Sequence, residues 1–558
     1  MDYPYDLGPY RRPVTTQVPA AQTWWDRGLM WCYGFNHEEA IACFREALAA
    51  DPSLAMAHWG IAWATGPNYN MPWAIYDEAG RAAALAAAHT ATEAALAGAD
   101  AAAPVEQALI AALPRRYPQA TPAEEETMRG WDADFAAAMR DVHALFPEDL
   151  DTATIFADAL MNLTPWQMWT LDGAPGPVTA ETRAVLETAL ARPGGMAHPG
   201  LLHLYVHLME MSPWPELALP QADVLRTLAP GAGHLVHMPS HIDIQVGDYA
   251  AALRANEAAS RANMVYYDRM GAMNLYTGYR IHDEHFAIYA ALFLGAEAPA
   301  HAALARMQAT VPEEMLRIES PPMADYFEAY LSMAPHILVR FGKWDQIVAM
   351  GYPEERALYC TLTAMIDYAK TVALSALGRV AEAETQMSRF EASKAAVPET
   401  RLLHNCRVVD LLDIATEMAR GELAYRKGSY DVAFAHLRRA VALDDALPYD
   451  EPWGWMQPTR HALGALLLEQ GRMEEAEKVY REDLGLAGAL PRACQHPDNV
   501  WSLYGLMTCL DARAAPEAER RLIAGKLAIA QARSDGIAAS CGCAQAAMAR
   551  SNSGCCAG

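Results

Sequence analysis

The sequence predicts an all-α fold in which helical hairpins stack into one curved array with a concave face for a metal ion or ligand. Three observations support this prediction. Small, aromatic and proline residues recur with a period of 34 residues. The segments between the clearest repeats keep helical periodicity, and the alternation typical of strands is almost absent. Length alone would suggest roughly three or four domains, and the period replaces them with one continuous array.

The first repeat begins at Ala21 and has the following residues at offsets 4, 8, 11, 20, 24, 27 and 32: Trp24, Gly28, Trp31, Ala40, Phe44, Ala47 and Pro52. This pattern resembles the tetratricopeptide repeat, two antiparallel helices with small residues where they cross and a proline after the second helix. Further matches are marked by Gly247, Gly342, Gly378, Gly421, Gly428, Gly464, Gly471 and Trp501. The resemblance implies a helical-hairpin solenoid.

The predicted organisation has four parts along the chain. They are an N-terminal arm (1–20), a solenoid (21–443) with a histidine-rich centre (198–285), C-terminal repeats (444–535) and a flexible cysteine-rich tail (536–558). Candidate breaks lie at Leu171–Val178, Arg192–Gly200 and Asp444–Pro458, where Gly and Pro gather. No long linker separates the parts, so we expect one array with irregular insertions.

Composition excludes several classes of partner. Hydrophobic residues make up 53% of the chain, enough for a large core. Against 68 Asp and Glu there are only 43 Lys and Arg, a net charge of −25, so nucleic acid and anionic membrane surfaces are poor partners. No signal-peptide pattern and no run of about 18 apolar residues occurs. We therefore expect a cytoplasmic protein whose thiols stay reduced.

Histidines repeat in phase with the period. Eight of the 18 histidines lie between His198 and His285. His203 and His207 are four residues apart, as are His237 and His241, and the two pairs are 34 residues apart. A four-residue step keeps both side chains on one helix face. With Gly295 as the turn glycine of the next repeat, His285 takes the same offset and His282 lies one turn earlier.

Six imidazoles on three neighbouring helices predict a metal site, because two histidines four residues apart form a bidentate grip. The ligands would be His203, His207, His237, His241, His282 and His285. Pro239 would either kink the second helix or begin it. The alternative is a set of buried histidines that only satisfy hydrogen bonds. Whether His461 or His58 joins the site through the curvature of the array stays open.

The ligand chemistry favours copper, as one or two ions, with zinc or iron as alternatives. Imidazole suits all three metals. The carboxylates of Glu210, Asp243, Asp283 and Glu284 are out of phase with the histidines. No Glu lies between the paired histidines to act as a general base, which weakens a zinc hydrolase reading. Tyr205, Tyr279 and Arg280 are the candidate catalytic residues that would bind or orient a substrate.

The cysteines divide into two groups. Six occur singly and are expected to pack in the core, while Cys541, Cys543, Cys555 and Cys556 crowd the tail. Thiolates on a flexible arm suit a soft ion such as Cu(I), Hg(II) or As(III). The closing Cys-Cys-Ala-Gly resembles the C-terminus of mercuric reductases, which implies a metal relay and no reductase activity. The alternative is an end whose cysteines have no function.

Three function hypotheses follow. The first is a copper-dependent oxidoreductase acting on a small molecule or peptide, with the tail delivering Cu(I). The second is a protein that binds, transfers or detoxifies thiophilic metals, and the third is a peptide-binding scaffold without catalysis. The segments HLY-x-H and GH-x-VHMP-x-H are similar to those of a broad group of bacterial and fungal tetratricopeptide-repeat proteins. That resemblance implies no particular activity.

Overall fold

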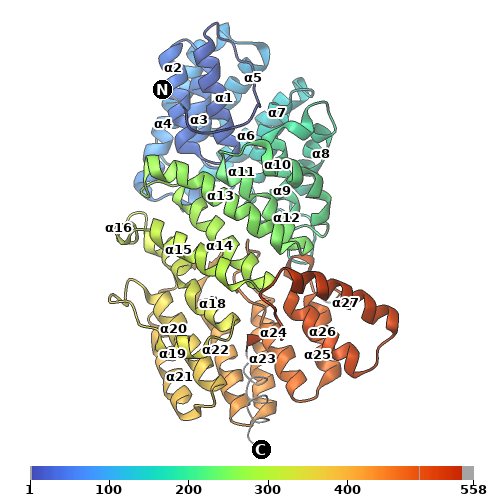
Figure 1. Cartoon of the computed structure of the whole chain (residues 1–558). Helices are drawn as coiled ribbons and strands as arrows, with labels where there is room; N and C mark the ends of the chain where they lie inside the picture. The colour runs from blue at the N-terminus through green and yellow to red at the C-terminus, as the bar shows by residue number, and fades with distance from the viewer. Residues whose placement is uncertain (1–2, 489, 543–558) are drawn as a thin grey trace, which may run out of the picture. The chain divides into compact units, whose positions relative to one another are not determined.

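The computed structural model describes residues 3–488 and 490–542, and within them the fold is all-α, as predicted (Figure 1). Regular strands in this part of the chain are confined to one short antiparallel hairpin, β1 (Leu402–Leu403) and β2 (Cys406–Arg407). Sequential helices pack against each other as hairpins, for example α1 with α2, α20 with α21 and α22 with α23. The chain is thus a tetratricopeptide-like helical array.

The chain divides into two compact units. The first comprises the chain up to Ile242 together with Ala258–Arg280, and the second comprises Asp243–Glu257 and the chain from Ile281 onward. The α-helices wholly in the first unit are α1 (Pro19–Tyr33), α2 (His37–Ala50), α3 (Ala55–Thr65), α4 (Glu78–Gly98), α5 (Pro104–Arg116), α6 (Glu125–Leu145), α7 (Leu150–Met161), α8 (Thr179–Leu190), α9 (Pro199–Met209), α10 (Leu219–Leu228) and α11 (Gly233–His237). Its short 3₁₀ turns are η1 (Trp73–Ile75), η2 (Ala99–Ala101), η3 (Gly195–Ala197) and η4 (Pro215–Ala218).

Three helices contribute residues to both units: α12 (Pro239–Val246), α13 (Tyr249–Met270) and α14 (Thr277–Leu294). The second unit continues with α15 (Glu297–Thr310), α16 (Glu313–Leu316), α17 (Met323–Phe327), α18 (Met333–Arg340), α19 (Trp344–Ala349), α20 (Cys360–Ala376), α21 (Val380–Ala395), α22 (Val408–Arg426), α23 (Tyr430–Asp444), α24 (Thr459–Glu469), α25 (Met473–Asp483), α26 (Val500–Ala512) and α27 (Glu517–Ala532). Two 3₁₀ turns, η5 (Glu328–Ser332) and η6 (Arg492–Cys494), complete it.

The repeat glycines receive an aromatic side chain of the neighbouring helix. Phe44 on α2 is fully buried, and a Cβ atom added at Gly28 of α1 or Gly60 of α3 would lie 2.4 or 2.7 Å from its ring. Tyr480 on α25 is held in the same way by Gly464 of α24 and Gly505 of α26, at 2.5 and 2.2 Å. The small residues of the repeat are therefore required because a ring fills the space where neighbouring helices meet.

Substituting Gly28 by Ala is expected to destabilise the protein by about 1–3 kcal/mol, because the new methyl group overpacks the Phe44 ring. Thermal unfolding followed by circular dichroism measures the effect. Gly130→Ala is the matched control, since nothing lies within 4 Å of the added Cβ. That control should leave stability unchanged or raise it by up to about 1 kcal/mol. Equal melting temperatures for the two variants would contradict this packing argument.

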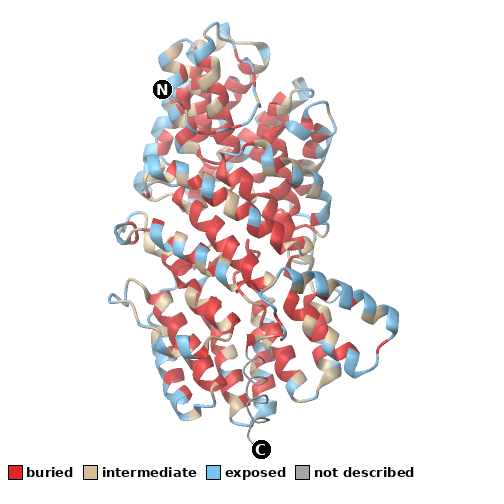
Figure 2. Cartoon of the chain, in the orientation of Figure 1, coloured by how far each residue is buried: buried red, intermediate tan, exposed pale blue. Residues whose placement is uncertain are grey.

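Two helices in the middle of the first unit are buried on every side. All 11 residues of α9 are buried, as are all five of α11 (Figure 2). A helix that is buried all round lies inside a core rather than on its surface. Polar side chains on α9 and α11 are therefore held in a water-poor environment, and these are the helices that carry the histidine pairs.

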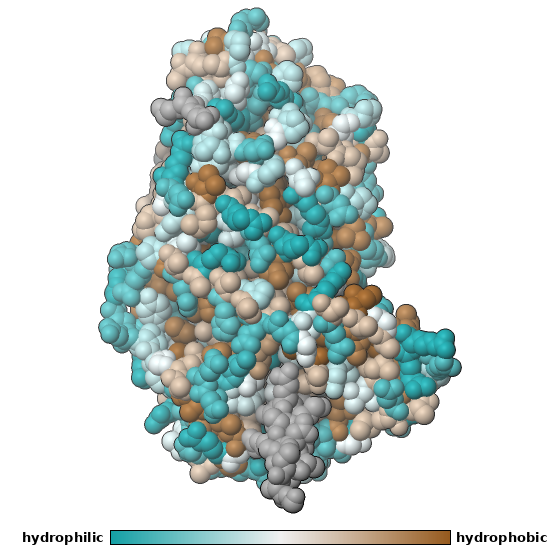
Figure 3. Space-filling model, viewed as in Figure 1, coloured by the Kyte–Doolittle hydropathy of each residue, from teal (hydrophilic) through white to brown (hydrophobic). Residues whose placement is uncertain are grey.

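Within the described residues, no helix is long and apolar enough to cross a membrane. The face seen in Figure 3 carries hydrophilic side chains with hydrophobic ones scattered among them. The six single cysteines, Cys32, Cys43, Cys360, Cys406, Cys494 and Cys509, are all buried. Their burial agrees with the packing role expected from the sequence.

Candidate metal centre

Helix α9 presents two histidines from a rigid position. Its N-cap residue His198 accepts a hydrogen bond from the Leu201 amide at 3.2 Å, and Pro199 occupies the first turn, where a missing N–H costs nothing. His203 and His207 then lie one turn apart, with their ring centroids separated by 4.8 Å. The sequence prediction that they share one helix face is met by this geometry.

The second histidine pair lies on two short helices rather than on one. Helix α11 ends at His237, and Pro239 begins α12, so the proline starts a helix instead of kinking one. Across this break the Nε2 atoms of His237 and His241 are 2.7 Å apart. Met238, between them in sequence, is fully buried.

Five imidazoles gather in the first unit. His234, which sequence reasoning did not select, places its Nε2 atom 3.1 Å from Nε2 of His203. Its ring centroid is 5.7 Å from that of His237 and 6.1 Å from that of His207. The rings of His207 and His241 are 5.6 Å apart, which closes the group. We call His203, His207, His234, His237 and His241 the five-histidine cluster.

The Nδ1 atoms of four cluster histidines face neighbouring polar groups. His203 Nδ1 donates to the carbonyl oxygen of Tyr33 at 2.6 Å. Glu210 accepts from Nδ1 of His207 at 3.0 Å with one carboxylate oxygen and contacts Nδ1 of His241 with the other. His237 Nδ1 lies 3.4 Å from the Ser240 hydroxyl. A carboxylate or carbonyl on one ring nitrogen sets the tautomer that leaves a lone pair on the other.

The cluster is fully enclosed, and this keeps imidazoles neutral. Each of its five histidines is at most 2% exposed. Burial, followed by the neighbouring histidines, holds the pKa of His203 and of His234 well below the ordinary value. Neutral imidazole is the form that binds a metal ion, so the electrostatics of the cluster suit metal ligation.

Aromatic rings wall the cluster. Phe35 has a φ of 55°, an uncommon conformation for a bulky residue. Its ring centroid lies 4.5 Å from that of His203 and 5.4 Å from that of His234. The Tyr69 ring lies 5.0 Å from His207, and the Tyr279 ring 4.7 Å from His234. These rings exclude bulk water and fix the orientation of the imidazoles.

A small cavity of about 10 Å³ adjoins His203. Such a volume holds about one water molecule. The cavity lining includes Tyr33, His37, Asn68 and Asp158. The space beside His203 is therefore large enough for a single water molecule.

The donor atoms fit a transition-metal ion. One nitrogen each from His203, His207 and His234 lie within 4.8 Å of one another, and all three residues are buried. Tetrahedral coordination with bonds of 2.0–2.1 Å places neighbouring donors about 3.3 Å apart. The 3.1 Å between Nε2 of His203 and His234 is close to that value. The spacing of these two nitrogens is therefore one that tetrahedral coordination would allow.

Two predicted ligands, His282 and His285, belong to the second unit. There the His282 ring lies 5.4 Å from that of His404, and the His285 ring meets Tyr330 edge-on at 5.1 Å. Burial, followed by the neighbouring His404 and His336, lowers the pKa of His285 to about 3. A single site shared by all six histidines stays a prediction.

The predicted catalytic residues have different surroundings. Tyr279 lies against His234, as described above. The Tyr205 hydroxyl donates to Glu187 at 3.1 Å, and burial together with Glu187 raises its pKa to about 12. Arg280 has its guanidinium carbon 4.7 Å from the centre of the Tyr267 ring. Of the three, Tyr279 is the residue that the structure places in ring contact with the cluster.

The remaining candidates lie elsewhere. His461 is in the second unit, between Arg340 and Asp483. His58 lies on α3 of the first unit and is half-buried. Of the four tail cysteines, Cys541 lines a cavity of the second unit. Cys543, Cys555 and Cys556 are outside the described residues.

Comparison with known proteins adds little about function. No protein-family model matches the chain, and no curated protein matches it. Among solved structures, human IFIT1 dimer with m7Gppp-AAAA is 12% identical over 93% of this chain and 92% of that chain, with a TM-score of 0.30. Naa15/Naa10 bound to HypK-THB is 14% identical over 92% of this chain and 71% of that chain, with a TM-score of 0.20. Neither likeness carries an argument about the site, and none of these comparisons supports the resemblance to mercuric reductases.

Proposed function

We propose that this protein is a metal-dependent oxidoreductase that holds copper in the five-histidine cluster and acts on a small molecule or peptide. One observation carries the proposal: four buried histidines direct Nδ1 to protein groups, and the Nε2 atoms of three of them meet another imidazole within the cluster. Ordinary histidines in a protein core do not need to direct their Nε2 atoms toward one another. Metal-ligating histidines routinely show this convergence.

Hydrogen bonding alone leaves the cluster poorly satisfied. His203 must carry its proton on Nδ1, because the Tyr33 carbonyl oxygen can only accept. A neutral His203 therefore offers a lone pair at Nε2, and His234 would have to donate from its own Nε2. Nδ1 of His234 would then be a buried acceptor, and it has no hydrogen-bond partner among the described residues. A metal ion between the two rings would accept the Nε2 lone pairs of both, so neither ring would have to donate to the other, and Nδ1 of His234 would carry its ring proton.

The donor set favours copper over zinc and iron. Imidazole dominates the cluster, and the carboxylate of Glu210 contacts two of its ring nitrogens. An occupied carboxylate is poorly placed to act as the general base of a zinc hydrolase. Non-haem iron sites usually include a carboxylate ligand. Copper bound here would supply one-electron oxidation and reduction.

The protein groups would control access and orientation. Glu210 and the Tyr33 carbonyl orient three imidazoles. Phe35 and Tyr279 keep bulk water from the rings. The cavity beside His203 has room for a ligand of about the size of one water molecule. The cysteine tail belongs to the same proposal as a carrier that acquires Cu(I) and passes it on, because thiolates bind Cu(I) well.

Metal analysis of untagged full-length protein, produced in medium with equal copper, zinc and iron, tests the proposal. We expect at least about one equivalent of copper, a Cu(II) electron paramagnetic resonance signal that ascorbate abolishes and air restores, and oxygen uptake that the metal-free protein lacks. Negligible bound metal would overturn the metal site itself. Tightly bound zinc without any redox signal would retain the site and overturn the oxidoreductase proposal.

A further inference from the structure

The second unit contains a cavity that the histidine cluster does not explain. Its volume is about 40 Å³, room for about three water molecules. Its walls are mostly aromatic and aliphatic: Val339, Trp344, Tyr368, Val372, Met418, Leu437, Trp455, Pro458 and Ala462. The polar lining consists of Arg340, Glu422, Gln457, His461 and Cys541. An apolar cavity with a few convergent polar groups is the usual form of a small-molecule site.

Arg340 is a buried cation at this cavity. It ends helix α18 and is 2% exposed. Its Nη1 donates to His461 at 2.8 Å and its Nε to the Leu292 carbonyl at 3.3 Å, while Nη2 has no hydrogen-bond acceptor among the described residues. Burial lowers its pKa to about 9, which still leaves the guanidinium charged at neutral pH. A buried charge with a spare donor is costly unless an anion satisfies it.

The other charged groups near the cavity are already matched. His461 lies between Arg340 and Asp483, with Nε2 2.9 Å from the Asp483 carboxylate. Glu422 receives a hydrogen bond from Arg426 at 2.8 Å. Neither carboxylate therefore offers Nη2 of Arg340 a direct partner, and no other acceptor among the described residues hydrogen-bonds this atom.

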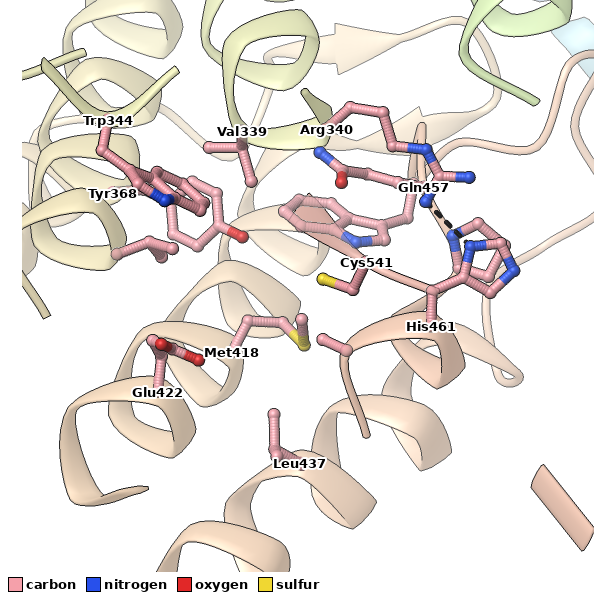
Figure 4. A pocket seen from close by; sticks show the side chains of 14 residues that line it. Val339, Arg340, Trp344, Tyr368, Met418, Glu422, Leu437, Gln457, His461 and Cys541 are labelled. Carbon is pink, nitrogen blue, oxygen red and sulfur yellow. Dashed lines mark hydrogen bonds between the residues drawn. The ribbon is translucent and has the colours of Figure 1, made fainter. Parts of the chain in front are cut away.

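The chain near its C-terminus brings a thiol to the same cavity. A Cβ atom at Gly542 would lie 2.7 Å from the carbonyl oxygen of Val339 and 2.9 Å from that of Arg340, so only glycine allows this close approach to the end of α18. Ala539 and Ser540 are buried just before it. Figure 4 shows the Cys541 sulfur between Tyr368 on one side and His461 on the other, with Arg340 and Gln457 above it.

We propose that this cavity binds a small organic anion, a carboxylate of two to four carbon atoms, with Arg340 as its anchor and the Cys541 thiol beside it. The guanidinium group can donate two hydrogen bonds to the carboxylate of the ligand. Alternatively it donates one hydrogen bond and the Gln457 side chain donates the other. The aromatic walls cover the short hydrocarbon part of the ligand. The site shares no residue with the five-histidine cluster, and its anchor Arg340 has no part in the proposed function.

Iodoacetate and iodoacetamide test the proposal, because they differ in the carboxylate that Arg340 would bind. In either reaction the Cys541 thiolate attacks the methylene carbon, the S–C bond forms, iodide leaves with the C–I electron pair, and the thiol proton passes to buffer. The modification at Cys541 of the full-length protein is followed with time by peptide mass spectrometry. The measured quantity is the ratio of the iodoacetate rate to the iodoacetamide rate.

We expect this ratio to be about tenfold higher in the wild type than in Arg340→Gln, which is what one charge-assisted hydrogen bond supports. Arg340→Lys should fall between the two, and Arg439→Gln, which removes an exposed charge, should match the wild type. In the wild type, propionate should slow labelling saturably and propionamide should not. This last arm needs no variant, so it decides the question even if Arg340→Gln fails to fold. Equal ratios in folded variants, no protection by propionate, or an unreactive Cys541 would each overturn the proposal.

Discussion

Replacing His234 by Ala is expected to weaken copper binding by about 100-fold or more, since loss of a hydrogen bond to a ligand alone costs 10–100-fold. The Nε2 atom of His234 lies 3.1 Å from that of His203. The substitution therefore removes one of the two nitrogen atoms that we expect to bind the copper ion together. It also removes the ring that contacts Tyr279. Competition with a chelator of known affinity measures the change in the copper dissociation constant.

His89→Ala is the matched control for this experiment. His89 lies on α4 in the same unit and contacts the Tyr117 carbonyl at 2.9 Å. The His89→Ala substitution removes an imidazole that is not part of the five-histidine cluster. The copper affinity of this variant should therefore stay within about twofold of the wild type. Circular dichroism should show both variants folded. Wild-type affinity in His234→Ala, or an equal loss in His89→Ala, would exclude the five-histidine cluster as the copper site.

Replacing Asp483 by Ala is expected to destabilise the protein by about 3–5 kcal/mol, the usual result of removing one member of a buried ionic network. One Asp483 oxygen accepts from His461 at 2.9 Å, from Asn499 at 2.9 Å and from Ser502 at 2.6 Å. The other accepts from His496 at 2.8 Å. Alanine would leave four donors at the junction of α24, α25 and α26 without this acceptor, three of them on buried residues.

The acidity of Asp483 makes this contribution dependent on pH. Burial alone would raise its pKa, but the electrostatic interactions and hydrogen bonds with His461 and His496 hold the pKa of Asp483 well below the ordinary value. A carboxyl whose folded pKa is depressed stabilises the protein above its unfolded pKa of about 3.9 and loses this effect as pH falls further. The wild-type advantage over Asp483→Ala should therefore be full at pH 7 and shrink below about pH 4.

Chemical denaturation at both pH values measures the Asp483 effect. Asp431→Ala is the control, because Asp431 is exposed in the first turn of α23. A surface substitution of this kind changes stability by about 0.5 kcal/mol or less. If Asp483→Ala is no less stable at pH 7 than Asp431→Ala, the buried network does not support the second unit.

The helical fold could be predicted from sequence because its signals are local. Gly28 and Phe44 are 16 residues apart, and so are Gly464 and Tyr480. In both places the aromatic ring covers the glycine of the preceding helix. Each repeat carries the residues that its own hairpin needs, so several repeats report the same fold independently.

The histidine cluster was predictable only in part. The spacing of four residues identified His203 and His207, and a period of 34 led to His237 and His241. His234 is three residues before His237, and that spacing was the one signal that could have revealed it. No spacing in the sequence indicated the role of Glu210. This residue follows the last turn of α9, and its carboxylate contacts both His207 of α9 and His241 of α12. A contact between two helices is a tertiary property, and helical phase does not report it.

The sequence by itself determined the helical hairpins, the acidic net charge and the four-residue spacing of the histidine pairs. These features follow from local residue spacing and from composition, and neither depends on how distant segments of the chain pack together. The tertiary structure decided which imidazoles meet, which carboxylate orients them, and where Cys541 lies. Those outcomes depend on packing between segments far apart in sequence, such as Gly542 against the end of α18, where sub-ångström differences in approach decide whether two groups touch.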